Sequence, residues 1–399
     1  MVLALLALLV TSSLLASGDT CGAAPFSVAV VGSGVGGAFS ATLVRQHFNA
    51  SALIDVYEGL AVGGRTQSIE VSGETVELGA SIFCELNYYL RDWAESLQLG
   101  RVPAGLNTTD APFAIFDGSS FVFQQSTWSA VSLCRLVWRY GLSYFRFRAA
   151  PTAIVQKYLR FYTLQREGFS ADTPEQLLQE VGLFDLTQKT FKDAIEAIIG
   201  SGSAAARFLD ELLSGINRVN YNQAALNAFA GMVSMFPFVD DRLYHVRGGN
   251  VRLSKALLTH AAARVHHPAA IQAIQRQPDG RWRLTLTSDT AATRQEDMIY
   301  DAVMVATPLE QANIQFEGFD PPPLPPRKYQ RTVTTLVSGR LQPTYFGVAA
   351  LPPGESIMVT AAAKTPFSSI APVIVFPNGT ITYKIFSAEP LATTLLNEI

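Results

Sequence analysis

Residues 27–48, SVAVVGSGVGGAFSATLVRQHF, combine a short apolar run, a glycine-rich turn and a stretch in which apolar residues recur with helical spacing. The spacing predicts a buried strand followed by a helix of about three turns. Gly32, Gly34 and Gly37 match G-x-G-x-x-G directly between the two, which is the context that this motif requires. The stretch therefore predicts the opening of an α/β fold that binds a dinucleotide.

The residues around this motif strengthen the prediction. Ser33 and Gly36 complete the turn, where unpaired N–H groups and the helix dipole favour phosphate groups. A second strand is expected at 52–57, and Glu58 follows it at the distance where a carboxylate accepts hydrogen bonds from ribose hydroxyls. A carboxylate at this position disfavours a 2′-phosphate, so the expected ligand is FAD or NAD rather than NADP.

A second glycine turn follows at once. Residues 60–68, LAVGGRTQS, resemble the second glycine signature of the amine oxidase and phytoene desaturase group of flavoproteins. Gly63 and Gly64 allow the backbone to lie against a cofactor, and Arg65 places a permanent cation beside it. Residues 66–82 then alternate apolar and polar side chains around a Ser-Gly-Glu turn, which predicts a hairpin instead of the crossover helix typical of an NAD domain. We therefore expect FAD.

The same resemblance implies further cofactor contacts. Residues 77–81, ELGAS, and 244–250, YHVRGGN, are similar to the segments that approach the flavin ring in that group, and residues 300–308 to the strand that returns past the dinucleotide. Gly248, Gly249 and Asn250 are candidates for the substrate pocket. The cofactor-binding residues expected are Gly32, Ser33, Gly34, Gly36, Gly37, Glu58, Gly63, Gly64, Arg65, Ala80, Ser81, Val265 and Ala306.

The order of these segments predicts a discontinuous architecture. An FAD-binding domain is expected at 26–104 and again at 241–312, with an inserted, largely helical substrate domain at 105–240 and the remainder of that domain at 313–399. Within the insertion, apolar spacing predicts helices at 128–147, 152–165, 174–181 and 192–199. The fold class is therefore a Rossmann-like FAD/NAD(P)-binding domain, α/β or α+β overall, with a helical substrate domain.

The amino-terminal sequence indicates the secretory pathway. Residues 1–18 carry an apolar run followed by small residues, which predicts a signal peptide. Sequons at Asn49, Asn107 and Asn378 predict glycosylated loops. The chain has only three cysteines and no metal-ligand spacing, so no metal site is expected.

Composition narrows the class of ligand. With 48% hydrophobic residues and a net charge of −3, the chain has a sizeable core and no polybasic field to attract nucleic acid. We expect a small or lipidic substrate. Arg135, Arg139 and Arg146 lie among apolar and aromatic residues at helical spacing, which predicts a basic face that either rests on an anionic bilayer or is simply solvated.

Segments outside the generic FAD motifs resemble the prenylcysteine oxidase family. They include residues 136–141, 218–221, 228–231, 306–309 and 334–337, and the likeness runs from about residue 27 to residue 387. This resemblance implies a flavin thioether oxidase of the lysosome that acts in the degradation of prenylated proteins. It converts farnesyl- or geranylgeranylcysteine and oxygen into cysteine, a prenyl aldehyde and hydrogen peroxide.

One expected segment has no counterpart. In the family, a final strand and helix cap the flavin, and nothing after residue 380 matches them, so we expect a shortened chain without this cap. Two alternatives stay open: another flavin oxidase of the same fold that acts on an amine or polyene, and a catalytically silent relative that binds lipid or a partner. No catalytic residue is identified, and the sequence leaves prenyl preference and oligomeric state open.

Overall fold

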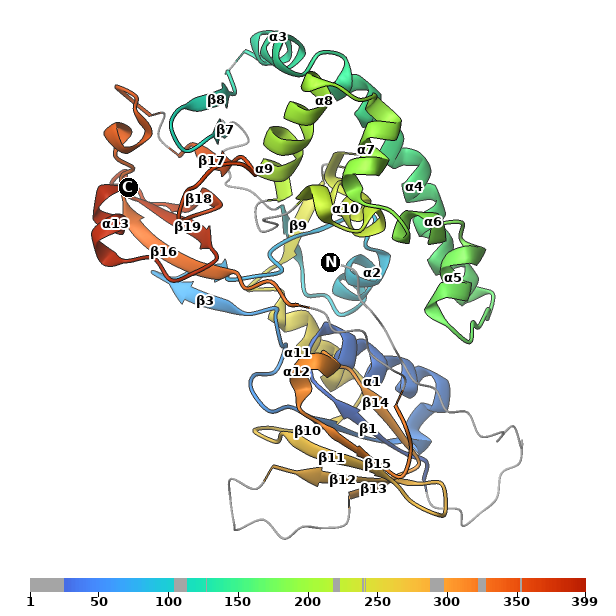
Figure 1. Ribbon diagram of the computed structural model, residues 1–399. Helices are drawn as coiled ribbons and strands as arrows, with labels where there is room; N and C mark the ends of the chain where they lie inside the picture. Colours follow the sequence, from blue (N-terminus) through green and yellow to red (C-terminus); the bar gives the residue numbers. More distant parts are fainter. Residues whose placement is uncertain are drawn as a thin grey trace.

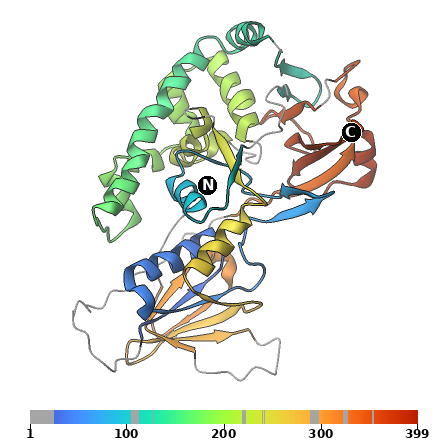
Figure 2. The same cartoon turned by 180° about the vertical axis from the view of Figure 1, so that it is seen from behind.

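The computed structural model describes residues 25–103, 113–126, 128–217, 223–238, 240, 242–287, 298–321, 328–351 and 354–399. These residues form two lobes (Figure 1). One lobe holds the first strands and helix of the chain together with the strands around residues 264–317. The other holds the helices between residues 129 and 234 and a sheet formed mainly by the last part of the chain (Figure 2).

A parallel sheet is the centre of the first lobe. Its strands run in the order β10 (Arg264–His266), β2 (Leu53–Tyr57), β1 (Ser27–Val31) and β14 (Ala302–Val305). Helices α1 (Val35–Phe48) and α11 (Val251–His260) cover one face and bury a shared core with the sheet. The predicted dinucleotide-binding fold is confirmed.

A second sheet covers the opposite face. It runs β13 (Met298–Tyr300), β12 (Trp282–Leu286), β11 (Ile271–Arg276) and β15 (Gln315–Glu317). Tyr57, Trp282 and Tyr300 are buried between the two sheets. The lobe is therefore a three-layer stack in which the parallel sheet is buried on both faces, as parallel sheets usually are.

A buried carboxylate joins strands of both sheets. Asp55 is 2% exposed and accepts hydrogen bonds from Arg264 at 2.6 Å and Tyr300 at 3.0 Å, while the His266 ring lies 2.7 Å away. The His266 ring also stacks on Tyr57. Because a buried charge needs partners, these contacts fix how β2, β10 and β13 sit together.

The predicted hairpin is confirmed as β3 (Ser68–Val71) and β4 (Glu74–Glu77), which pair in antiparallel register. It leads to β5 (Phe83–Cys84), α2 (Tyr88–Ser96) and β6 (Arg101–Pro103). Strand β9 (Leu243–Val246) pairs with both β5 and β6. This small sheet lies between the lobes and directs the chain from one to the other (Figure 1).

The stretch after residue 105 is not helical throughout. Residues 113–124 form a hairpin of β7 (Phe113–Phe116) and β8 (Phe121–Gln124). The Asp117 side chain accepts hydrogen bonds from the N–H groups of Ser119 and Ser120 and closes the turn. An Asp-Gly-Ser-Ser turn between apolar runs is a hairpin signal that the helical prediction overlooked.

The single helix expected over residues 128–147 is two helices. Helix α3 (Ser129–Tyr140) ends where Gly141 adopts a φ of 59°, and α4 (Ser143–Arg166) then continues through Pro151. The remaining helical elements follow in order: α5 (Pro174–Glu180), α6 (Phe184–Thr187), α7 (Phe191–Ile199), α8 (Ser203–Arg207), a π-helical segment (Phe208–Leu213), α9 (Ser214–Asn217) and α10 (Ala228–Ser234). Short 3₁₀ turns occupy Asn49–Ser51, Gln223–Ala225 and Phe236–Phe238.

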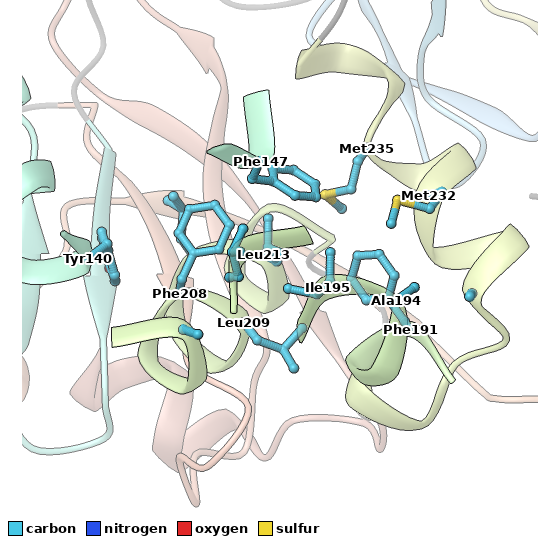
Figure 3. Packing of buried hydrophobic residues seen from close by; sticks show 14 of the residues in the cluster. Tyr140, Phe147, Phe191, Ala194, Ile195, Phe208, Leu209, Leu213, Met232 and Met235 are labelled. Atoms are coloured by element: carbon cyan, nitrogen blue, oxygen red, sulfur yellow. The ribbon is translucent and has the colours of Figure 1, made fainter. Parts of the chain in front are cut away.

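An aromatic core holds these helices together. Tyr140, Phe147, Phe191 and Phe208 are fully buried and converge with Met232 in Figure 3. They come from four different helical elements and from α10, so the core joins segments that are distant in sequence. Burial of such side chains stabilises the fold by about 2 kcal/mol each.

The sheet of this second lobe has six strands, in the order β16, β19, β18, β17, β7 and β8. Its later strands are β16 (Val333–Gly339), β17 (Ser356–Val359), β18 (Ser369–Val375) and β19 (Ile381–Ser387). Helix α13 (Thr393–Glu398) and a 3₁₀ turn at Pro343–Phe346 flank them, whereas α12 (Leu309–Ala312) follows β14 in the first lobe (Figure 1). The hairpin β7–β8 thus joins strands that follow it by more than 230 residues.

The closest backbone approach in the first lobe yields a prediction. A Cβ on Gly37 would lie 1.8 Å from the Gly32 carbonyl oxygen, so Gly37→Ala forces α1 away from β1. We expect a loss of at least about 2 kcal/mol in the free energy of unfolding, measured by urea denaturation. Gly339→Ala is the matched control because a Cβ there meets nothing within 4 Å. Equal stability of the two variants would contradict this role.

Candidate functional site

Two glycine turns touch at the carboxyl end of the parallel sheet. Gly34 and Gly63 form an isolated β-bridge, and the Gly63 N–H donates to the Ser33 carbonyl oxygen at 3.2 Å. A Cβ built on Gly64 would lie 3.1 Å from the Gly34 Cα. The two turns predicted to bind one cofactor are therefore adjacent, and their contact depends on the absence of side chains.

Helix α1 points its amino terminus into this junction. Gly34 is its N-cap and offers no side chain to satisfy the first N–H groups of the helix. Gly36 and Gly37 lie in its first turn. An uncapped amino terminus combines free donors with the positive end of the helix dipole, so it favours the phosphate groups of a dinucleotide.

Glu58 lies beside the same turn at the end of β2. Its carboxylate accepts hydrogen bonds from the Ser33 N–H at 2.9 Å, the Ser33 hydroxyl at 2.7 Å and the Leu60 N–H at 2.8 Å. Burial alone would raise the pKa of Glu58, but these hydrogen bonds hold its pKa below the ordinary value. Glu58 is thus an ionised acceptor, as recognition of ribose hydroxyls requires.

The other predicted adenosine contacts lie on the flanking strands. Val265 is in β10 and is 39% exposed, and Ala306 follows β14, where its N–H donates to the Val31 carbonyl oxygen. The Thr307 hydroxyl is buried without a hydrogen-bond partner among the described residues. The exposed Val265 in β10 and the unpaired buried hydroxyl of Thr307 both suit a polar ligand that lies across the sheet.

Arg65 is exposed beside the second glycine turn, and no hydrogen bond or ion pair of its side chain occurs in the described part of the chain. The neighbouring Thr66 hydroxyl donates to the Gly63 carbonyl oxygen at 2.7 Å and fixes the turn. Gly79 lies close by, because a Cβ on it would be 3.6 Å from the Arg65 carbonyl oxygen. The Arg65 cation is therefore available between the two glycine turns and the 77–81 segment.

A second cluster brings that segment to the predicted substrate-side residues. The Asn250 N–H donates to the Glu77 carboxylate, and the Asn250 side-chain amide donates to the Ala80 carbonyl oxygen at 2.8 Å. The Asn250 side-chain oxygen accepts from the Val246 N–H at 2.8 Å. Both ends of the Asn250 amide are thus engaged with backbone, so Asn250 acts as a positioning residue. Gly249 is buried and Gly248 exposed beside it.

Glu77 is an unusual carboxyl group at this junction. It is 8% exposed, and its second oxygen has no hydrogen-bond partner within the described ranges. Burial raises the pKa of Glu77 to about 7, although the Asn250 N–H and the Lys384 cation both oppose the shift. Glu77 therefore exchanges a proton near neutral pH, which the sequence motif alone did not indicate.

Lys384 is a site residue that the sequence analysis missed. Its ammonium group donates to the Ser81 hydroxyl at 3.0 Å and to the Glu77 carbonyl oxygen at 3.1 Å. The Thr334 hydroxyl, from the neighbouring strand, donates to the Leu78 carbonyl oxygen at 2.7 Å. The six-stranded sheet thus holds the segment predicted to face the flavin. The only signal in the sequence was a lysine inside the apolar strand ITYKIFS.

The residues fit FAD. Glu58 and the α1 amino terminus suit the adenosine and pyrophosphate, the touching glycines leave room for backbone contact, and Thr307 offers an unused hydroxyl. The 77–81 segment, held by Asn250 and Lys384, suits the flavin end. The cofactor of this chain is FAD.

Comparison with protein-family models gives two matches. A model described as prenylcysteine lyase matches residues 123–399, and one described as an NAD(P)-binding Rossmann-like domain matches residues 30–97. Similar curated proteins include prenylcysteine oxidase 1-like from Bos taurus, 34% identical over 84% of this chain and 68% of that protein. The chain belongs to the prenylcysteine lyase family.

Other relatives agree with this assignment. Human prenylcysteine oxidase 1-like is 33% identical over 86% of this chain and 68% of its own length, and human prenylcysteine oxidase 1 is 31% identical over 81% and 65%. The two family models together cover both glycine turns and most of the second lobe. This member of the prenylcysteine lyase family is an FAD-dependent oxidoreductase.

Solved structures show the same fold at low identity. A putrescine oxidase variant superposes with a TM-score of 0.57 at 15% identity, covering 93% of this chain and 77% of that one. A putative protoporphyrinogen oxidase from Exiguobacterium gives 0.54 at 17%, covering 92% and 78%. The family member thus shares its two-lobed architecture with flavin oxidases of other substrates.

Lys384→Met should weaken the junction between the lobes. The change removes two hydrogen bonds from a cation to the 77–81 segment, so we expect about 1–2 kcal/mol less stability in urea and weaker FAD retention on gel filtration. Lys384→Arg should lose less, because it keeps the charge.

Lys364→Met is the matched control, since Lys364 is exposed in the same lobe. If Lys384→Met and Lys364→Met retain FAD equally well, Lys384 does not support the flavin-facing segment.

Proposed function

We propose that this chain oxidises the thioether of prenylcysteines with oxygen. The main support is that the prenylcysteine lyase model matches residues 123–399, a range that includes most of the second lobe. Flavin oxidases of one fold differ in substrate through their second lobe, so similarity there bears on the substrate more than similarity in the dinucleotide motif does.

The reaction balances with the components named. A prenylcysteine, oxygen and water give cysteine, a prenyl aldehyde and hydrogen peroxide. The carbon attached to sulfur is oxidised, its bond to sulfur breaks, and water supplies the aldehyde oxygen. Bound FAD supplies the two-electron oxidation and passes the electrons to oxygen.

The residues of the chain then have positioning roles. Glu58 and the amino terminus of α1 hold the adenosine half, while Asn250 and Lys384 fix the backbone of residues 77–81. Glu77, whose pKa is about 7, can hold a proton beside that segment. No side chain is assigned to the chemical step, which suits a reaction in which the cofactor does the oxidation.

We also propose that the protein works in an acidic compartment of the secretory pathway, the lysosome being favoured. The apolar leader at 1–18 and the sequon at Asn107 lie outside the described residues. Asn49 and Asn378 are both exposed, which glycosylation requires. Glu77 and Glu355 are buried carboxyl groups with pKa values raised to about 7, so both are neutral at acidic pH.

Glu355 allows a pH test. Glu355 is 1% exposed, and burial alone raises its pKa to about 7 from an ordinary value near 4.5. A raised pKa means that its contribution to stability is complete below the ordinary value and is lost as the pH rises through 7. Glu355→Gln cannot ionise, so we expect a smaller fall in the free energy of unfolding between pH 5 and 8 than in the wild type.

Urea denaturation at a series of pH values measures this difference. Glu389→Gln removes an exposed carboxylate and is the control. It should keep the wild-type pH profile of stability. A Glu355→Gln profile parallel to the wild type would show that Glu355 is not neutral in the folded protein at pH 5.

Anaerobic reduction tests the proposed reaction. The purified chain, loaded with FAD, should lose the oxidised flavin absorption band when farnesylcysteine is added, and readmitted oxygen should restore the band with one peroxide per aldehyde. 3-(Farnesylthio)propionate, which keeps the thioether but lacks the amino group, serves as a substrate control.

A flavin that stays oxidised with farnesylcysteine but is reduced by an amine or polyene would overturn the substrate assignment. A chain that takes up no FAD would instead favour the catalytically silent lipid-binding or partner-binding relative.

A further inference from the structure

Helix α3 exposes an unusual set of apolar side chains. Trp138 is 92% exposed, Trp128 is 74% exposed and Leu142, in the turn after α3, is 61% exposed. We call this the aromatic face and define it by Trp128, Val131, Leu133, Trp138, Leu142 and Phe145. Large apolar side chains gathered on one exposed surface usually mark an interaction site.

The geometry of α3 separates this face from the core. Trp128, Val131 and Trp138 follow one stripe at spacings of three and seven residues, while Ser132 and Tyr140 are buried on the opposite side. Figures 1 and 2 show α3 at the outer rim of the helical lobe, away from the dinucleotide-binding lobe. The aromatic face is therefore directed outward at an extremity of the molecule.

The arginine face expected from the sequence is not formed. The Arg139 guanidinium makes a two-pronged ion pair with Glu211 at 2.5 and 2.8 Å, and Arg146, on α4, donates to the Ile199 carbonyl oxygen at 3.2 Å. The break at Gly141 places the two arginines on different helices, and Arg139 is half-buried whereas Arg146 is exposed. The three arginines therefore do not share one helical face, and the exposed surface of α3 combines apolar side chains with Arg135.

The part of the chain that carries the aromatic face has basic but no acidic residues. The sequence has no Asp or Glu from residue 118 to residue 166, although the whole chain carries a net charge of −3. Arg135, on α3, and Arg148, on α4, are both exposed. This stretch of the chain is thus positively charged in a protein that is acidic overall, which matches an anionic surface.

We propose that the aromatic face docks on an anionic lipid bilayer. Tryptophan has an apolar body and an N–H donor, so it partitions into the interface between lipid head groups and acyl chains. Exposed Arg135 and Arg148 complement acidic head groups. None of the described helices is long and apolar enough to cross a bilayer. The proposed contact is peripheral, with α3 lying on the surface.

A second copy of this chain is a poorer occupant for this face. A symmetric contact would bring Arg135 and Arg148 of both copies together, which is repulsive. The docking proposal goes beyond the proposed function, because it concerns a surface and holds whichever substrate the enzyme oxidises.

Vesicle binding tests the proposal. The full chain should co-sediment with vesicles of phosphatidylcholine containing phosphatidylserine, and binding should fall when salt is raised or phosphatidylserine is omitted. The double variant Trp128→Ser with Trp138→Ser should bind at least about tenfold more weakly, because two inserted side chains are lost. Bromine-labelled lipids should quench tryptophan fluorescence in the wild type and much less in this variant.

Val375→Ser is the matched control, since Val375 is an exposed apolar residue, 48% exposed, at the end of β18. It should bind vesicles like the wild type. Both tryptophans are exposed, so circular dichroism should show an intact fold in every variant. Equal vesicle binding by the double variant and the wild type would overturn the proposal, as would absence of binding by the wild type. Tryptophan-dependent dimers that persist in place of vesicle binding would assign the face to a second copy.

Discussion

The approach of α1 to β1 at Gly37 sets the geometry on which the cofactor site depends. A Cβ at Gly37 would lie 1.8 Å from the Gly32 carbonyl oxygen, so only glycine lets the helix begin so close to the strand. This approach places the uncapped amino terminus of α1 against the second glycine turn, where Gly34 and Gly63 meet. Glu58 then reaches the Ser33 N–H from the next strand. The adenosine and pyrophosphate positions follow from these backbone contacts.

The flavin end depends on a different kind of interaction. Residues 78–81, which follow β4, form no helix or strand, and polar contacts from two distant segments hold them in place. Asn250 binds the Ala80 carbonyl oxygen, and Lys384 binds the Ser81 hydroxyl. Part of this network is buried, and burial raises the pKa of the Glu77 carboxyl group to about 7. The two lobes are therefore joined where the chemistry is expected, which is common in enzymes of two domains.

Local patterns in the sequence predicted the first lobe well. Strand β1, the glycine turn and helix α1 form one continuous stretch, and the hairpin β3–β4 shows clear alternation, so neighbouring residues determine both. The hairpin β7–β8 was missed because an expected run of helices outweighed the Asp117 turn. The break at Gly141 was missed because apolar spacing continues across it, and only the backbone conformation of one glycine separates α3 from α4.

Long-range contacts could not be predicted from any local pattern. Lys384 reaches Ser81 across 303 residues of sequence, and nothing in the strand around Lys384 indicates that partner. Likewise, Arg139 finds Glu211 through the packing of α3 on the π-helical segment, so its availability to a membrane could not be judged from helical spacing.

The most direct test of the cofactor site compares the affinities of the purified apoprotein for FAD and for FMN. The quenching of flavin fluorescence measures both. The glycine turns and Glu58 recognise the adenosine diphosphate half of the cofactor, which FMN lacks. The structure therefore predicts one equivalent of FAD bound and FMN bound at least about a hundredfold more weakly, since several hydrogen bonds are lost. Equal affinity for the two flavins would contradict the assignment of the glycine turns and Glu58 as the site of the adenosine diphosphate half.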